Sequence, residues 1–338
     1  MISVSDEVAL RQYLVARGVA SPGEAIEIRH LSGGVSCEVA RVTTPRTELV
    51  IKQALPKLRV KEDWFSDLRR IITEKDCLAV YQRVVPRSVP ELRFADEENF
   101  LFAMEAAPPE AEMWKKQLLD GKVDFGVGET VAAVLATIHN ATSRNSGVRA
   151  RFLDVELFVQ LRIEPYWRKV AERHPDLAAD IAAEIDRNLS TKLALVHGDY
   201  SPKNILVSRD RIYLIDFECA HFGDPAFDIA FVTNHLMLKA VKNKPWAKAY
   251  LDLMVEMAHR YFAAVDFTEA KTLEEHAVRS LAFLLLARID GKSPAEYITD
   301  DLDKHLVRKV SYRMVRERLR TYHEVREALS SAIAVAGG

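Results

Sequence analysis

Short apolar runs alternate with polar turns in the first third of the chain, whereas later apolar residues recur at helical spacing. The first third predicts, in chain order, a helix at 5–17 capped by Ser5, strands at 25–30, 37–43 and 49–54, a helix at 64–84, and a hairpin of 92–95 with 100–104. From 126 onward the spacing predicts helices at 127–142, 156–173, 175–189, 227–239, 246–264, 272–288 and 301–331. The chain is therefore expected to be an α+β protein.

A different pattern interrupts the helices at 193–216, where two short strands each end in a turn that carries a carboxylate. An apolar run stops at His197-Gly198-Asp199, Asn204 opens the strand 205–207, and the strand 212–215 stops at Asp216. Pairing of these strands as a hairpin would bring Asp199, Asn204 and Asp216 to the same end of a small ribbon.

Three oxygen-bearing side chains at one end of a ribbon suit phosphoryl transfer. Mg²⁺ takes oxygen ligands and is often held by one or two carboxylates plus substrate phosphates. Asn204 and Asp216 can supply those ligands, which leaves Asp199 to accept a proton from a hydroxyl. The H-x-D-x-x-x-x-N spacing matches a kinase catalytic loop, and Asp216-Phe217-Glu218 lies where that pattern has D-F-G.

These elements, followed by Gly223-Asp224-Pro225 and Asp228, resemble the aminoglycoside phosphotransferase and choline kinase superfamily, small-molecule relatives of the protein kinases. The resemblance covers roughly residues 25–300. It implies a bilobal protein-kinase-like fold. The implied parts are a nucleotide-binding lobe of antiparallel sheet plus helix at 1–105, a hinge at 106–112, and a helical lobe with the catalytic loop and acceptor site at 113–338. ATP and Mg²⁺ are the implied cofactors.

The resemblance also assigns nucleotide-binding residues. Gly33 and Gly34, in a turn between two strands, would lay backbone N–H groups over the phosphates. Lys52, on the third strand, would contact the phosphates, held there by Glu74; Glu62 is the other candidate partner. Backbone groups of Glu105 and Ala107 would contact adenine.

Three further polar residues are expected to have structural roles. His139, in the last turn of the helix 127–142, is interpreted as a hydrogen-bonded core histidine. Asp228 would hold the catalytic loop from below, and His197 would support that loop by hydrogen bonds.

The sequence departs from the family pattern at two positions. Ser201 stands where protein kinases have lysine and aminoglycoside kinases often have histidine, and nearby Lys203 is expected to be solvent-exposed. Glu218 replaces the glycine of D-F-G, as in the D-x-E pattern of methylthioribose kinases. Glu218 could therefore be a further metal ligand or could face an amine on the substrate.

The acceptor site is expected among the C-terminal helices. The helix 272–288 ends in charged residues before Gly291, and Arg288 and Asp290 are the candidate substrate contacts. An ordinary helix C-terminus would also explain Arg288, because a cation complements the helix dipole there.

Composition narrows the partners and the location. Lys and Arg number 47 against 49 Asp and Glu, for a net charge of −2, which gives no basic footprint for nucleic acid. No apolar run approaches membrane-spanning length, and the first residues lack the pattern of a secretory signal. The three cysteines show no paired spacing, which favours a reducing cytoplasm.

The sequence thus predicts an ATP- and magnesium-dependent kinase acting on a hydroxyl of a small polar metabolite, such as a sugar, thiosugar, aminoglycoside or amino alcohol. A catalytically silent pseudokinase that regulates a partner is the alternative. A protein kinase is disfavoured because the segment from Asp216 to Pro225 is too short for an activation loop. The acceptor, the choice of ATP over GTP and the oligomeric state stay open.

Overall fold

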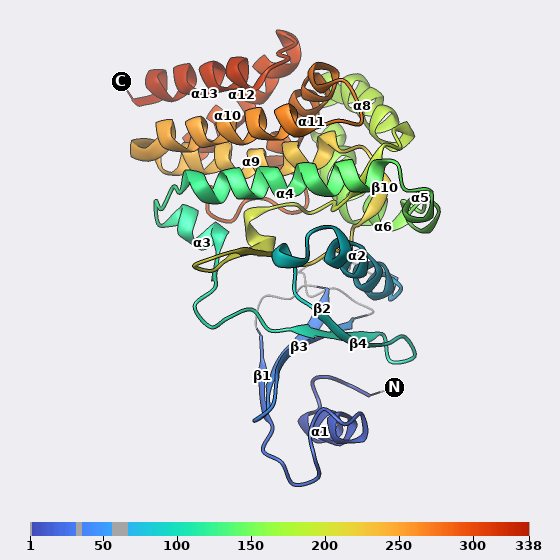
Figure 1. Cartoon of the computed structure of the whole chain (residues 1–338). Helices are drawn as coiled ribbons and strands as arrows, with labels where there is room; N and C mark the ends of the chain where they lie inside the picture. The colour runs from blue at the N-terminus through green and yellow to red at the C-terminus, as the bar shows by residue number, and fades with distance from the viewer. Residues whose placement is uncertain (1, 32–35, 56–66, 338) are drawn as a thin grey trace.

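The protein consists of a small lobe built on an antiparallel sheet and a larger, mainly helical lobe (Figure 1). This computed structural model describes residues 2–31, 36–55 and 67–337. The small lobe contains α1 (Glu7–Ala16), β1 (Glu27–His30), β2 (Cys37–Thr43), β3 (Glu48–Ala54), α2 (Arg70–Val84), η1 (Pro86–Ser88), β4 (Leu92–Asp96) and β5 (Leu101–Glu105). The predicted bilobal α+β fold is confirmed.

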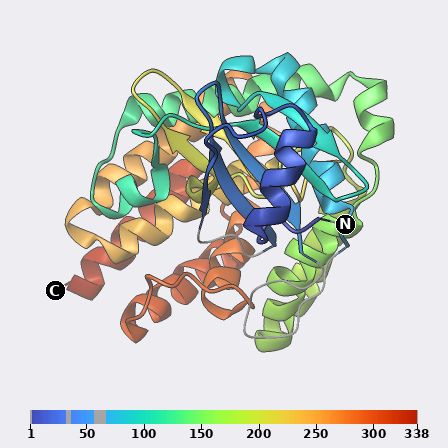
Figure 2. The same ribbon diagram turned by 90° about the horizontal axis from the view of Figure 1, so that it is seen from below.

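The five-stranded sheet has the order β1-β2-β3-β5-β4, and its two faces pack against different partners. Side chains alternate between the faces along each strand. One face presents Ala40, Ile51 and Ala103 to a core that includes Leu10 and Leu14 of α1. Figure 2 shows α1 lying across this face. The other face, which carries Phe102 and Met104, belongs to the main core. Lys52, opposite Phe102 in the β3–β5 register, therefore points toward the large lobe.

The large lobe is a stack of helices on two small β ribbons. Its elements are β6 (Glu112–Met113), α3 (Trp114–Leu119), α4 (Phe125–Ser143), α5 (Ser146–Arg151), α6 (Glu156–Phe158), the π-helix η2 (Val159–Arg168), α7 (Lys169–Arg173), η3 (Pro175–Leu177), α8 (Ala178–Ser190), β7 (Ala194–Val196), η4 (Pro202–Asn204), β8 (Ile205–Val207), β9 (Ile212–Leu214), β10 (His221–Gly223), α9 (Ala226–Lys242), η5 (Lys244–Trp246), α10 (Ala247–Ala264), α11 (Ala270–Asp290), α12 (Asp301–Arg316) and α13 (Tyr322–Gly337).

The ribbon predicted for the catalytic stretch forms as expected. β8 pairs with β9 in antiparallel register, with Ile205 opposite Leu214, and Ile215 N–H donates to the Asn204 carbonyl. Asn204 and Asp216 therefore lie at the same end. β6 pairs with β8, so the chain joins the large lobe at Glu112. This pairing supports our proposal that 106–112 is the hinge between lobes 1–105 and 113–338.

Several boundaries differ from the prediction. Asp6, rather than Ser5, caps α1, because its carboxylate accepts from the N–H groups of Val8 and Ala9. The helix expected at 64–84 begins at Arg70 among the described residues. The helix expected at 301–331 is divided into α12 and α13, because Arg318 adopts φ +54° and turns the chain.

Among the described residues, no helix is both long enough and apolar enough to cross a membrane. Cys37, Cys77 and Cys219 are buried free thiols, as their unpaired spacing predicted.

Candidate active site

Lys52 joins the small lobe to the catalytic ribbon of the large lobe. Its ammonium lies 2.5 Å from Glu74 Oε1 of α2 and 2.9 Å from Asp216 Oδ1. Lys52 and Glu74 are buried. Burial alone would lower the pKa of Lys52, but the Asp216 and Glu74 carboxylates outweigh burial and raise this pKa well above its ordinary value. The predicted pairing of Lys52 with Glu74 is confirmed, whereas Glu62 lies outside the described residues.

Asp216 follows β9 in a strained backbone conformation. Its φ is +71°, a left-handed conformation that is costly for a residue other than glycine and that clusters at functional sites. Burial would raise the pKa of Asp216, but the ammonium groups of Lys52 and Lys203 hold it below its ordinary value. The carboxylate therefore stays charged between the two lobes.

The catalytic loop is held from below by Asp228 at the start of α9. Its carboxylate accepts from the N–H groups of His197, at 2.7 Å, and Gly198, at 2.9 Å. His139 lies 3.3 Å from the same carboxylate and 2.7 Å from the Tyr261 hydroxyl. The structural roles predicted for Asp228 and His139 are confirmed.

Gly198 has φ +74°, and a Cβ at this position would lie 2.6 Å from the Cys219 carbonyl oxygen. Only glycine satisfies both the turn and this close approach, so Gly198 fixes where Asp199 projects.

Asp199 is surrounded by donors from two elements. The Asn204 amide donates to its Oδ2 at 2.8 Å and to its carbonyl at 3.0 Å. Arg162, on the π-helix η2, contacts Asp199 Oδ2 at 2.9 Å and donates to the Gly198 carbonyl at 2.8 Å. Sequence reasoning missed Arg162. Its contact crosses from one helix to a distant loop, and local spacing carries no signal of such a contact.

The expectation of a solvent-exposed Lys203 is confirmed, although its ammonium also faces the catalytic carboxylates. Its side chain is 47% exposed, yet the ammonium lies 3.9 Å from Asp199 Oδ2 and 4.0 Å from Asp216 Oδ2. Ser201, where relatives carry a cation, is buried. Lys203 thus places a positive charge near both carboxylates. It lies two residues after position 201, where the family pattern has its cation.

The predicted metal ligands Asn204 and Asp216 present oxygen atoms of the type that Mg²⁺ prefers. The Asn204 nitrogen is used by Asp199, and in the described part of the chain no hydrogen bond reaches its Oδ1. No group of three His, Cys, Asp or Glu side chains forms a complete metal site in that part. This donor set fits an ion that takes its other ligands from phosphate and water.

Glu218, the residue that departs from D-F-G, lies close to α2. Its Oε2 is 3.4 Å from Arg70 Nε, and burial, with the nearby Asp216 charge, raises the pKa of its carboxyl. Its role as a metal ligand or a substrate contact stays a prediction.

Four other residues are predicted to bind the nucleotide. Gly33 and Gly34 lie outside the described residues. Glu105 ends β5, and its N–H donates to the Glu91 carbonyl; its contact with adenine stays a prediction. Ala107 follows in the segment that joins the lobes and is half-buried.

His197 supports the loop as predicted, through its Nδ1, which accepts from the Asp199 N–H at 3.2 Å. Its ring also contacts Phe217, at a centroid distance of 5.1 Å, and Phe217 contacts Tyr81 of α2 at 5.2 Å. Burial lowers the pKa of His197. A neutral aromatic column therefore runs beside the charged contacts between the lobes.

The two predicted acceptor residues have different surroundings. Asp290 accepts both Arg308 Nε, at 2.8 Å, and Arg308 NH2, at 2.7 Å, and lies 2.9 Å from His174 Nε2. These contacts explain its burial structurally. Arg288 NH1 contacts the Tyr166 hydroxyl at 3.3 Å and Ser293, while its Nε is buried without a hydrogen-bond partner among the described residues. Contact with substrate stays a prediction for both.

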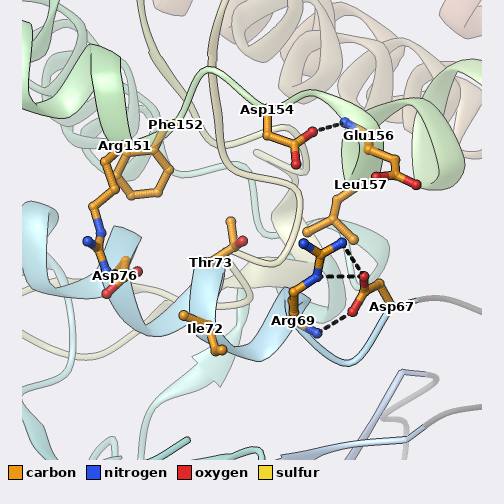
Figure 3. Close-up of a pocket in the computed structure, with 10 residues that line it drawn as sticks. All are labelled: Asp67, Arg69, Ile72, Thr73, Asp76, Arg151, Phe152, Asp154, Glu156 and Leu157. Carbon is orange, nitrogen blue, oxygen red and sulfur yellow. Dashed lines mark hydrogen bonds and ion pairs between the residues drawn. The ribbon is translucent and has the colours of Figure 1, made fainter.

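A separate pocket of about 410 Å³ lies between α2 and the segment around Asp154 (Figure 3). It contacts Ile72 and Asp76, on the face of α2 opposite Glu74. The charged Arg69 and Arg151 beside it are paired with Asp67 and Asp76. The pocket includes none of the predicted site residues.

Comparison with known proteins shows the family to which this chain belongs. The profile described as the phosphotransferase enzyme family, APH, matches residues 27–260. The chain belongs to this phosphotransferase family. It is a small-molecule kinase, and ATP is the nucleotide that such kinases use.

Among characterised sequences, the phosphotransferase is 24% identical to the methylthioribose kinase of a Geobacillus species, over 78% of this chain and 73% of that protein. It is 25% identical to the methylthioribose kinase of Geobacillus kaustophilus, over 74% of this chain and 70% of that one.

Its fold matches solved structures at lower identity. An ethanolamine kinase from Plasmodium vivax superimposes with a TM-score of 0.59 at 14% identity, covering 94% of both chains. A choline kinase from Cryptosporidium parvum gives 0.57 at 13% identity, covering 93% of this chain and 98% of that one. These matches confirm the protein-kinase-like fold.

Proposed function

We propose that this phosphotransferase moves the γ-phosphoryl group of ATP to a hydroxyl of a small polar metabolite. The main supporting observation is the position of Lys52, whose ammonium contacts Glu74 in one lobe and Asp216 in the other. One nucleotide between the lobes could then meet Lys52, Asn204 and Asp216 together. Sugars, thiosugars, aminoglycosides and amino alcohols are the candidate acceptors, and the methylthioribose kinase relatives support the thiosugar class.

Each side chain has a defined part in this proposal. Asp199 orients the acceptor hydroxyl and receives its proton. The acceptor oxygen bonds to the γ-phosphorus as the bond from that phosphorus to the β–γ bridging oxygen breaks, and ADP leaves. Lys203 balances the negative charge near the transferred group. Asn204 and Asp216 would hold Mg²⁺, which when bound neutralises phosphate charge.

Glycines 33 and 34 would cover the phosphates, and the backbone of Glu105 and Ala107 would contact adenine. Glu218 would add a ligand on the metal side. Arg162 acts as a positioning residue, because it touches Asp199 and the Gly198 carbonyl.

Replacement of Asp199 tests the proposal before the acceptor is known. Asp199→Asn should lower ADP formation, both from slow hydrolysis of ATP and in the presence of acceptors, by about 10²–10⁴-fold. The affinity for ATP should be unchanged in calorimetric titration. Asp210→Asn, on the exposed turn at the other end of the ribbon, is the matched control. ATP binding without ADP formation by the unmodified protein, across a panel of hydroxyl acceptors, would instead identify a pseudokinase.

A further inference from the structure

Three cations meet on the acceptor side of the large lobe with too few anions to balance them. Lys239 of α9, Arg288 of α11 and Lys115 of α3 form what we call the cationic cluster. Lys239 and Lys115 lie over the Tyr297 ring at 5.2 and 5.9 Å. The Lys115 and Arg288 charges both act on Lys239. Glu296 pairs with Lys115, and its charge also acts on Lys239 and Arg288, so a single carboxylate faces three basic groups.

Lys239 is the most unusual member of the cluster. It is fully buried, and its ammonium donates only to the His235 carbonyl, at 3.4 Å, among the described residues. It forms no ion pair with any carboxylate there. An ammonium removed from water without a counter-ion costs several kcal/mol, and burial lowers the pKa of Lys239 to about 7. An apolar side chain at this position would stabilise the fold more than an unpaired ammonium, so stability alone does not explain Lys239.

Further polar atoms beside the cluster also lack partners. Arg288 Nε and the Tyr297 hydroxyl are buried without a hydrogen bond in the described part of the chain. Buried polar groups are nearly always satisfied by protein or by a bound molecule. Donors are in excess here, so the missing partner is an acceptor of hydrogen bonds.

The cluster is close to the catalytic carboxylate. Arg162, which contacts Asp199, lies over both the Tyr166 and Phe231 rings at 5.7 Å. Tyr166 in turn touches Arg288, and Phe231 touches His235 at 5.5 Å. Phe231, His235 and Lys239 follow at i, i+4 and i+8, so they share one face of α9. On the other side, α3 packs against η4 of the catalytic loop. A small molecule with its hydroxyl at Asp199 could reach the cluster with its far end.

We propose that the cationic cluster binds an anionic group of the acceptor, a carboxylate or a phosphate, so that the substrate is a hydroxylated acid or a phosphate ester. This inference rests on the proposed kinase function; among small polar metabolites it favours anionic acceptors over the neutral and cationic ones named above. Cationic acceptors such as amino sugars and amino alcohols would meet repulsion from Lys239 and Arg288. A carboxylate or phosphate would instead complete the charge balance and the hydrogen bonds that the fold leaves open.

The test compares matched acceptors. ADP formation would be measured with D-gluconate against D-glucose, with D-ribose 5-phosphate against D-ribose and methylthioribose, and with glucosamine and choline as cations. We expect kcat/KM to be at least about tenfold higher for an anionic member than for its neutral partner. A higher kcat/KM for gluconate than for glucose would identify the anion as a carboxylate. A higher kcat/KM for ribose 5-phosphate than for ribose would identify it as a phosphate. A preference for a neutral or cationic acceptor would overturn the inference while leaving the kinase function intact.

Variants locate the effect. Lys239→Met should raise KM for the preferred anion at least about tenfold and leave the KM for ATP unchanged. Lys242→Met, on the same helix but exposed, should change neither. Arg288→Gln provides a second variant with the same expected direction. An unchanged KM for the anion in both Lys239→Met and Arg288→Gln would contradict the proposal.

A binding readout separates the two proposals. Calorimetric titration of gluconate and ribose 5-phosphate into the protein, without nucleotide, should show binding that Lys239→Met weakens. Binding without phosphorylation of any acceptor would support the anion site and contradict the kinase function. Absence of binding, together with turnover of a neutral sugar, would contradict the anion site and support the kinase function.

Discussion

The catalytic ribbon and the cationic cluster are both buried and charged, but the charges of the ribbon are paired and those of the cluster are mostly unpaired. In the ribbon, Asp216 contacts Lys52, and Asp199 contacts Arg162 and Asn204. In the cluster, Lys239 and Arg288 have no carboxylate partner within the described residues. The paired region positions groups for a reaction common to the family. In our proposal, the unpaired region binds the anionic group of the acceptor.

The difference predicts opposite effects on stability when a charge is removed from each region. In the paired region, Asp228→Asn replaces an oxygen that accepts from the loop N–H groups with an NH₂ group that cannot. We expect the free energy of unfolding to fall by about 3 kcal/mol, measured by urea denaturation. A loss below 1 kcal/mol would show that the loop does not depend on this carboxylate.

Arg162→Met should have the next largest effect. It leaves Asp199 and the Gly198 carbonyl without their guanidinium, so kcat should fall about 10- to 100-fold, with the KM for ATP unchanged. Arg162→Lys should recover part of the loss. Arg168→Met, on the same π-helix but exposed and paired with Glu164, is the control. Equal effects of Arg162→Met and Arg168→Met would argue against a positioning role.

Glu74→Gln removes the negative charge that pairs with Lys52 but keeps the size and shape of the side chain at position 74. Because hydrogen bonds to charged groups contribute about 1.5–3 kcal/mol, we expect the KM for ATP to rise about tenfold. The acceptor KM should stay constant, since Glu74 lies on α2 in the small lobe. Steady-state kinetics with each substrate varied in turn would measure both constants. A change confined to the acceptor KM would be inconsistent with this role.

In the cationic cluster, by contrast, Lys239→Met should stabilise the protein. The pKa of Lys239 is about 7 in the fold, against an ordinary value of 10.5. The cost of the buried ammonium is therefore full below pH 7, declines as the pH rises from 7 to 10.5, and is absent above that range. Lys239→Met should add about 1 kcal/mol to the free energy of unfolding at pH 6, and less at pH 9.

Urea denaturation at both pH values would measure this gain, with Lys242→Met as the control. A loss of stability at pH 6 would show instead that Lys239 belongs to a satisfied part of the core, and the contrast between the two regions would disappear.

The two regions also differ in how far the sequence predicts them. Asn204 and Asp216 lie at one end of the β8–β9 hairpin, and Asp199 lies in the loop just before it. Their spacing therefore brings them together, and the alternation of β3 determines where Lys52 points. Arg162 was missed because its contact depends on how η2 packs against the loop. The sequence predicts a helix that ends at Lys239, because the spacing of apolar residues does not distinguish a lysine at a helix end from a buried one. The helix predicted at 301–331 was wrong for a similar reason, since the turn at Arg318 depends on a backbone angle that composition does not reveal.

The contact between Lys52 and Asp216 has a consequence for how a nucleotide enters. The ammonium already has two carboxylate neighbours, whose negative charges more than offset its single positive charge, so it attracts a distant anion only weakly. A phosphate arriving there must exchange places with a resident carboxylate at close range. Nucleotide association should therefore respond only slightly to ionic strength, unlike capture by an unshielded lysine.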